Sequence, residues 1–379
     1  MSVVTFKELS CRINGCNTHK KIGVAELNNP KALNALNLDM IRMLHTQMQS
    51  WESDENISVV FLQSSSDKSF CAGGDIVSLY NDIKNEGHNL APLNDKKISQ
   101  SLSSDFLKEE YALDFYLHKY SKPLIVWGNG FVIGGGLGLF AGCSHRIVTE
   151  NTLMAMPEVA IGLYPEVGAS WFLNKMPDNL GAFLAITGSF FNAGDAKYLG
   201  LSNLSIQHIY KEEVINTLCE VDWGDKASSY TNVDEVLNVF DSLSLASKQI
   251  PKSSIEENHL IINRLMALDN IDEISEAILN TQFQDVWLQN AQNKLQKASV
   301  LSVLIAYKQL KLTVRYSKAE CFEAELNLSR RCCQHRELEE GIRAQLIDKD
   351  KRPQWTYKNF KDIEPTLISW FFSPISSSY

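Results

Sequence analysis

Residues 124–143 read LIVWGNGFVIGGGLGLFAGC, and this stretch decides the fold. Its twenty residues carry no charge, so on length alone they could cross a bilayer as one helix. Seven of them are glycines, however, and Gly128-Asn129-Gly130 has the composition of a tight turn. This composition therefore argues against one continuous helix that faces lipid. The stretch instead predicts a strand, a turn, a glycine-rich loop and a buried helix, and we expect no membrane span.

The segments on the N-terminal side of this stretch alternate between two patterns. Short apolar runs at residues 22–27, 59–62 and 123–126 suit strands, and residues 38–51 and 106–120 place apolar side chains at helical spacing. Such alternation predicts an α/β core.

The C-terminal part has a different composition. From Ser253 to about Lys349 the glycines nearly vanish, and apolar residues fall at helical spacing. We therefore expect an α/β core over residues 1–205 and a mainly α-helical region over residues 206–379.

The charge and the cysteines exclude several classes of protein. The 379 residues include 36 Lys and Arg against 45 Asp and Glu, a formal net charge of −9, so we expect no nucleic-acid partner. The eight cysteines form no Cys-x-x-Cys pair and no ligand spacing with histidine, which predicts reduced thiols and no metal site. The first residues lack a signal or transit pattern, and from this we expect a cytoplasmic enzyme.

Two glycine-rich segments suggest a binding site made of backbone. Residues 70–75 (FCAGGD) and 134–138 (GGGLG) each follow an extended run and precede a helical pattern. Glycine permits close backbone approach, and a helix start leaves N–H groups without helical partners. Two such groups aimed at one point would form an oxyanion hole, as thioester hydrolysis and enolate chemistry both require. The competing interpretation is that both segments are only tight turns.

A third segment supplies acids. Residues 156–168 (MPEVAIGLYPEVG) place Glu158 and Glu166 in an apolar loop rich in glycine and proline. A carboxylate held among apolar groups can act as a base, acid or nucleophile near neutral pH. Alternatively, both are exposed loop acids, as most glutamates are.

These motifs resemble those of the crotonase superfamily. Residues 69–75 and 128–138 are similar to its two oxyanion-hole motifs, and residues 29–36 (NPKALNAL) are similar to its N-terminal coenzyme A loop. The resemblance implies a ββα spiral core. It implies that the N–H groups of Gly74 and Gly135 hold the thioester oxygen, and that Ala72 and Lys31 bind coenzyme A.

A narrower resemblance reaches the C-terminal region. Residues 108–111, 156–158, 160–165, 340–344 and 346–350 are similar to the 3-hydroxyisobutyryl-CoA hydrolase branch of that superfamily. The branch implies that Glu158 is the catalytic carboxylate and that Glu110 and Glu166 line the acyl pocket, Glu166 near the substrate hydroxyl. Coenzyme A would belong to the substrate, so no separate cofactor is expected.

Two positions depart from the patterns of these relatives. Where the branch usually has Asp, this chain has Glu166, whose extra methylene alters which acyl group fits. Enoyl-CoA hydratases use two glutamates, and the first of the pair aligns with Gly138, which has no side chain. Glu158 alone can activate water or attack the thioester directly, so hydrolysis is favoured over hydration.

The sequence-based hypothesis is therefore a thioester hydrolase that converts 3-hydroxyisobutyryl-CoA to the free acid, as in valine breakdown. The alternatives are an enoyl-CoA hydratase or isomerase on the same fold, a dinucleotide-binding dehydrogenase suggested by the glycines at 136–138, and a non-catalytic acyl-CoA-binding protein. We expect an acyl-CoA substrate as partner, and a homo-oligomer is left open.

Overall fold

The computed structural model describes residues 2–86, 102–224 and 229–375. The chain forms two compact units, each assembled from three segments. The first unit contains Met1–Gly74, Leu113–Met154 and Phe191–Glu256, and the second contains Asp75–Ala112, Ala155–Phe190 and Glu257–Tyr379. The division expected at residue 205 falls inside the last segment of the first unit and stays a prediction.

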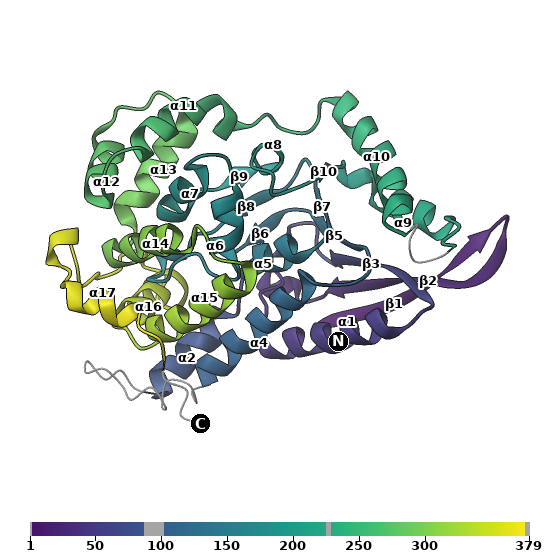
Figure 1. Cartoon of the computed structure of the whole chain (residues 1–379), viewed down its shortest axis with the longest axis horizontal. Helices are drawn as coiled ribbons and strands as arrows, with labels where there is room; N and C mark the ends of the chain where they lie inside the picture. Colours follow the sequence, from purple (N-terminus) through teal and green to yellow (C-terminus); the bar gives the residue numbers. More distant parts are fainter. Residues whose placement is uncertain (1, 87–101, 225–228, 376–379) are drawn as a thin grey trace. The chain divides into compact units, whose positions relative to one another are not determined.

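The first unit contains a six-stranded sheet. Its strand order is β1 (Val4–Ile13), β2 (Cys16–Leu27), β3 (Ile57–Ser64), β5 (Leu124–Gly128), β7 (His145–Val148) and β10 (Leu204–Ser205). Strands β1 and β2 pair antiparallel as a long hairpin, and every later neighbour pairs parallel (Figure 1). The predicted α/β class is confirmed, because the connections between these parallel strands contain helices, as parallel pairing usually requires.

Helices cover both faces of this sheet. Ile22 and Val24 of β2 belong to an apolar core shared with α9 (Lys211–Cys219) and α10 (Ser229–Ser247). The residue between them, Gly23, points to the other face, where a Cβ atom would lie 2.8 Å from the Trp51 ring of α1 (Leu38–Ser53). The alternation along one strand thus places one helix layer on each side.

A second, four-stranded sheet carries the glycine segments. Its order is β4 (Ser69–Cys71), β6 (Phe131–Ile133), β8 (Leu153–Ala155) and β9 (Phe191–Asn192). Helix α5 (Gly135–Gly142) follows β6 directly, and α8 (Ala193–Tyr198) follows β9. Residues 124–143 therefore form two strands and a short buried helix, as predicted. Within the described ranges, none of the helices has the length and hydropathy needed to cross a membrane.

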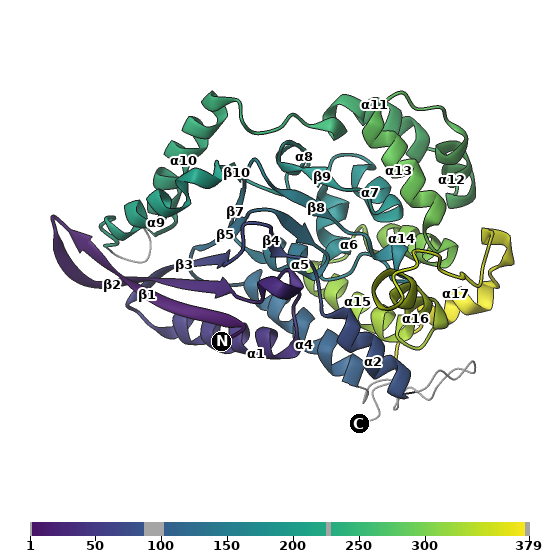
Figure 2. The same ribbon diagram turned by 180° about the vertical axis from the view of Figure 1, so that it is seen from behind.

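The second unit is helical. Its α-helices include α2 (Ile76–Glu86), α6 (Ala169–Phe172), α7 (Leu180–Thr187), α11 (Ser254–Met266), α12 (Ile271–Asn280), α13 (Val286–Lys297), α14 (Val300–Thr313), α15 (Lys318–Cys332), α16 (Arg336–Ile342) and α17 (Pro365–Phe371). Helix α4 (Leu102–Leu117) contributes residues to both units. Every described element after β10 is a helix or a helical turn, so the predicted helical C-terminal region is confirmed (Figure 2).

Helix α15 shows why this region folds as it does. Ser317 and Glu320 form a capping box at its start, which satisfies the N–H groups that a helix leaves unpaired there. Apart from Arg331, its buried residues recur three or four positions apart and make one apolar face with two polar members: Cys321, Phe322, Glu325, Leu328, Ser329 and Cys332. This face packs into the second unit, and its polar members are described with the site below.

Candidate active site

The loop at residues 29–36 is fixed to strand β4 in the first unit by Asn34. The buried Asn34 amide donates to Ser64 Oγ at 2.7 Å and to the carbonyls of Ser69 and Phe70 at 3.2 Å, and its oxygen accepts from the Asn29 N–H at 2.7 Å. A buried amide with all these partners holds the loop in one position. The exposed Lys31 lies in the short helical turn η1 (Pro30–Ala32) of this loop.

Backbone bonds bring this loop to the first glycine segment. The Ala72 N–H donates to the carbonyl of Leu33 at 3.1 Å, and the Leu36 N–H donates to the carbonyl of Gly73 at 2.8 Å. Leu36 and Gly74 form an isolated parallel bridge. In this pattern the backbone groups of the residues on either side of Gly74 make the hydrogen bonds to Leu36, so the N–H of Gly74 takes no part in the bridge. Ala72 and Gly74 therefore lie beside the predicted coenzyme A loop.

The two glycine segments lie against each other. Strand β4 pairs with β6, and a Cβ atom on Gly136 would lie 2.4 Å from the Cys71 carbonyl oxygen. Only glycine permits this approach. Gly135 begins α5, where first-turn N–H groups lack helical partners. Gly74 and Gly135 are thus close together on one backbone surface that can hold a negatively charged oxygen. We call this surface the glycine cradle.

The loop that carries Glu158 belongs to the second unit and is fixed by the C-terminal helices. Glu158 begins the helical turn η2 (Glu158–Ala160), and the Ser299 N–H donates to the Val159 carbonyl at 2.9 Å. A Cβ atom on Gly162 would lie 2.1 Å from the Glu337 carbonyl oxygen, and one on Gly341 would lie 2.2 Å from the Ile161 backbone. Two segments of the narrower resemblance, residues 160–165 and 340–344, therefore contact each other.

Three buried carboxyl groups meet in this unit, and we call them the carboxylate cluster. Glu110 of α4, Glu158 of η2 and Glu166 are 3%, 5% and 6% exposed. Each has one buried carboxyl oxygen without a hydrogen-bond partner among the described residues. The interpretation of Glu158 and Glu166 as exposed loop acids is therefore wrong. Such oxygens are available to a substrate or a water molecule.

Burial also controls the protonation of the cluster. Desolvation raises the pKa of Glu158 to about 8, and the charge of Glu110 adds to the rise. Desolvation alone raises the pKa of Glu110 to about 8. Burial raises the pKa of Glu166 well above its usual value, with further increases from Glu110 and Glu158. A carboxyl group with a pKa near 8 can accept and return a proton at physiological pH.

Sequence reasoning missed four residues around the cluster. The Tyr111 hydroxyl lies 2.7 Å from Ser329 Oγ, and Tyr111 is near enough to Glu166 for each to shift the pKa of the other. The Tyr164 hydroxyl donates to the Glu325 carbonyl at 2.9 Å. Tyr111 and Tyr164 stand within motifs quoted above, whereas Glu325 and Ser329 could have been found only as polar residues on the apolar face of a predicted helix.

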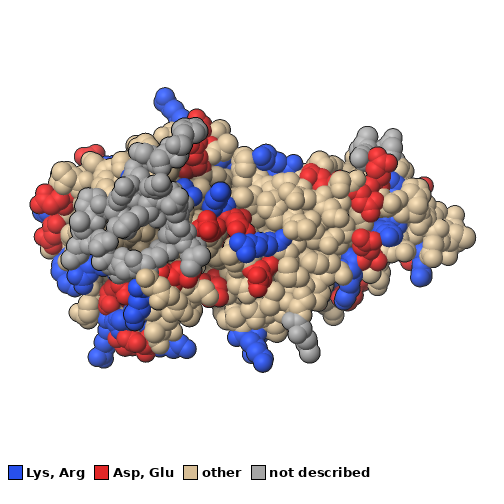
Figure 3. Space-filling view, turned by 90° about the horizontal axis from the view of Figure 1, so that it is seen from below, with Lys and Arg blue, Asp and Glu red and all other residues tan. Residues whose placement is uncertain are grey.

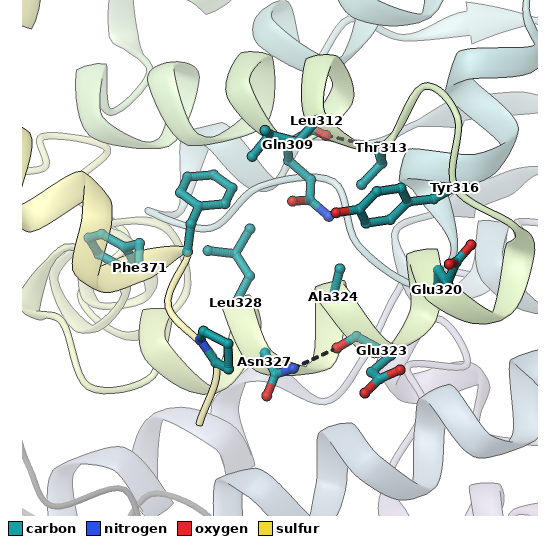
Figure 4. A pocket seen from close by; sticks show the side chains of 12 residues that line it. Gln309, Leu312, Thr313, Tyr316, Glu320, Glu323, Ala324, Asn327, Leu328 and Phe371 are labelled. Carbon is teal, nitrogen blue, oxygen red and sulfur yellow. Dashed lines mark hydrogen bonds between the residues drawn. The ribbon is translucent and has the colours of Figure 1, made fainter. Parts of the chain in front are cut away.

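A separate cavity of about 350 Å³ lies within the second unit, on another side of α15. Figure 4 shows Gln309 of α14 and Tyr316 above it, Leu328 and Ala324 of α15 below, and Phe371 beside it. None of the predicted site residues lines this cavity, which is therefore distinct from the carboxylate cluster.

The described surface has no large basic face on the side drawn in Figure 3, where Lys and Arg are interspersed with Asp and Glu. Lys31 is exposed in its loop, as a contact to phosphate would need. Among residues 2–86, 102–224 and 229–375, no group of three or more His, Cys, Asp or Glu is arranged to hold a metal ion. The expectation that no cofactor resides in the protein stays a prediction.

The model of the enoyl-CoA hydratase/isomerase family matches residues 22–372. This chain belongs to that family. Within the family it is similar over nearly its whole length to proteins named 3-hydroxyisobutyryl-CoA hydrolase, mitochondrial. The one from Danio rerio is 35% identical and covers 94% of this chain and 88% of its own length. Those from Xenopus laevis and Homo sapiens are each 33% identical, covering 100% and 94% of this chain and 92% and 87% of their own.

Solved structures agree on the enoyl-CoA hydratase/isomerase fold. An enoyl-CoA hydratase from Rhodobacter sphaeroides 2.4.1 has a TM-score of 0.80 at 25% identity and covers 98% of each chain. A carnitinyl-CoA dehydratase from Mycobacterium thermoresistibile has the same score and identity and covers 99% of this chain and 97% of its own. The crotonase resemblance and the expected fold are therefore confirmed.

The expected cytoplasmic location is wrong, because the similar hydrolases are named mitochondrial proteins. The physical reason for the error is that targeting signals are addresses read by receptors, and the composition of the folded part does not record them. The first residues of this sequence therefore could not decide the compartment.

Proposed function

We propose that this protein hydrolyses 3-hydroxyisobutyryl-CoA to 3-hydroxyisobutyrate and coenzyme A, as in valine breakdown. The observation that carries the proposal is its similarity to enzymes of that name over almost the whole of both chains. The buried acid beside an apolar loop and the backbone surface of the glycine cradle supply the chemical groups that a thioester hydrolase needs.

In this proposal the N–H groups of Gly74 and Gly135 stabilise the negative charge that develops on the thioester oxygen. Glu158 takes the proton from a water molecule whose oxygen attacks the carbonyl carbon. The carbon–sulfur bond then breaks, and the proton passes to the sulfur of the departing coenzyme A. Alternatively, Glu158 attacks the carbonyl carbon itself, the carbon–sulfur bond breaks and the coenzyme A thiolate leaves. Water then hydrolyses the mixed anhydride, which releases the acid, restores the Glu158 carboxylate and supplies the proton for the thiolate. Both routes need the ionised carboxylate, which a pKa of about 8 provides for part of the protein at neutral pH.

The other two acids of the carboxylate cluster would bind the acyl group of the substrate. Glu110 and Glu166 would contact the 3-hydroxyacyl part, with Glu166 at the hydroxyl group, because each offers one unpartnered carboxyl oxygen. Lys31 and Ala72 would bind coenzyme A, the first through its phosphates and the second through its backbone carbonyl. No resident cofactor or metal is needed, and a homo-oligomer would be compatible with these roles.

Hydration on the same fold is the second candidate. It is disfavoured because Gly138 stands where hydratases carry the other glutamate, and Gly138 is buried within α5 with no side chain to supply an acid.

Release of free thiol from purified protein tests the proposal. We expect turnover of 3-hydroxyisobutyryl-CoA, slower turnover of 3-hydroxypropionyl-CoA, and no hydration of crotonyl-CoA. Absence of thiol release above the spontaneous rate would refute the hydrolase assignment, and hydration of crotonyl-CoA would favour the second candidate.

A further inference from the structure

The backbone directly after Glu166 is held in an unfavourable conformation. Val167 has a φ of +54° and Gly168 a φ of +85°, and the Ala169 N–H donates to the Glu166 carbonyl at 2.9 Å, closing a tight turn. Glycine adopts such angles readily, whereas a β-branched valine rarely does. A strained residue persists only where its surroundings impose it, and strain of this kind gathers at functional sites.

Glu325 of α15 imposes this turn. One of its carboxylate oxygens accepts from the Gly168 N–H at 2.6 Å, and the other accepts from the Ser170 N–H at 2.8 Å and from the Ser170 hydroxyl. Glu325 is fully buried. Its pKa is raised to about 7 by burial, which the bonds from Ser170 and Gly168 partly oppose. A buried carboxylate with three donors is a strong and directional anchor.

Ser329, one helical turn further along α15, holds the tyrosine that lies beside Glu166. Ser329 Oγ lies 2.7 Å from the Tyr111 hydroxyl and 2.9 Å from the Tyr164 hydroxyl. Tyr111 is buried beside Glu166, because it lowers the pKa of Glu166 against the larger effect of burial, and the charge of Glu166 raises the pKa of Tyr111. One face of α15 therefore holds both the backbone after Glu166 and the tyrosine beside its carboxylate.

We infer that Glu325 and Ser329 are positioning residues that aim Glu166 at the hydroxyl group of the acyl chain, so that α15 sets the preference for 3-hydroxyacyl thioesters. This inference rests on the proposed function. Its reason is geometric, because Glu166 has one more rotatable bond than aspartate and needs additional contacts to stay in one orientation.

The test compares two substrates that differ only in the hydroxyl group, 3-hydroxyisobutyryl-CoA and isobutyryl-CoA. In Glu325→Gln and in Ser329→Ala we expect kcat/KM for the hydroxylated substrate to fall about tenfold, the effect of one hydrogen bond to a charged group. Turnover of isobutyryl-CoA should change little. Glu323→Gln is the matched control, because Glu323 is exposed on the same helix, and it should leave both rates unchanged.

Each outcome is decisive. An equal fall for both substrates, or no change in their ratio, would mean that α15 has a merely structural role. If Glu325→Gln does not fold, Ser329→Ala and Glu325→Asp are compared instead. For both, the measurement is the ratio of kcat/KM between the two substrates, and Glu325→Asp is expected to restore part of the wild-type ratio. Failure of the wild-type protein to release thiol from either substrate would refute the proposed function and would be seen before any variant is compared.

Discussion

The glycine cradle and the carboxylate cluster are built in opposite ways. The cradle consists of backbone, and its parts come from two short motifs on adjacent strands, β4 and β6. The cluster consists of side chains from α4, from η2 and the loop after it, and it is supported by α15. A site made of backbone groups tolerates few residue types at its glycine positions. A site made of side chains depends on helices that are distant in the sequence to hold those side chains in place.

The difference explains how one family can share an oxyanion site and vary its chemistry. Gly136 and Cys71 fix the cradle by a contact that leaves no room for a Cβ atom. A side-chain site such as the cluster, by contrast, can change by a single substitution, as the Glu at position 166 illustrates. On the proposed function, we therefore expect reaction type and acyl preference to depend mainly on the side chains, and binding of the thioester oxygen to depend on the backbone.

The largest expected effect is on the cluster. Glu158→Gln keeps the size of the side chain and removes its ability to accept a proton or attack a carbonyl. We expect kcat to fall about 10³-fold, within the range attributed to a positioned acid or base, while KM changes little. Thiol release under saturating substrate measures this. Retention of more than a tenth of the activity would remove Glu158 from the mechanism.

The matching change in the cradle is Gly136→Ala. Alanine normally stabilises a helix relative to glycine by about 1 kcal/mol, but here its Cβ atom would meet a backbone carbonyl at 2.4 Å. We expect the steric clash to outweigh the gain in helix propensity. The oxyanion donors should shift and reduce kcat about 10²-fold, and the free energy of unfolding should fall by about 2 kcal/mol. Thiol release and urea unfolding measure the two effects. Normal activity together with increased stability would show that the cradle is not as closely packed as described.

The third prediction concerns the dependence of stability on pH. The folded pKa of Glu110 is about 8, above the ordinary 4.5, so the folded state keeps a proton that the unfolded chain releases. The contribution of this group to stability is complete below pH 4.5 and is lost as the pH rises to 8. Glu110→Gln should therefore raise the free energy of unfolding at pH 8 by about 2 kcal/mol and alter it little at pH 4.5.

Denaturant unfolding at both pH values tests this difference, with the exposed Glu323→Gln as control. An equal effect of Glu110→Gln at pH 4.5 and pH 8 would show that packing, and not the proton, accounts for the change.

The smallest effect is expected from Glu166→Asp, which restores the residue that the branch usually has. The side chain becomes one methylene shorter, so the carboxylate moves back by about 1.5 Å and favours a bulkier acyl group. We expect a change of about threefold in the ratio of kcat/KM between 3-hydroxyisobutyryl-CoA and 3-hydroxypropionyl-CoA, with stability unaltered. An unchanged ratio would show that Glu166 does not contribute to recognition of the acyl group.

Much of the fold could be predicted from the sequence because its signals are local. Residues 124–143 combine apolar runs with glycines at the turn and at the start of α5, and each signal acts within a few positions. Each of the two glycine motifs of the cradle is recognisable for the same reason, although they lie about sixty residues apart and meet only through the pairing of β4 with β6. The surroundings of Glu158 could not be predicted, because its burial depends on α14 and α16, more than a hundred residues away. Glu325 was overlooked because its only signal is its position on the apolar face of a helix, and most glutamates are exposed.

The contact between Gly341 and Ile161 also sets an order of events during synthesis. Both glycine segments have been made once residue 138 leaves the ribosome, whereas the loop after Glu158 acquires its last neighbours about two hundred residues later. Because chains fold from the N-terminus as they are made, the loop that carries the acid obtains its full support only after residue 341 has been made. An unfinished chain of this protein would thus contain the surface for a thioester oxygen without a fully supported acid.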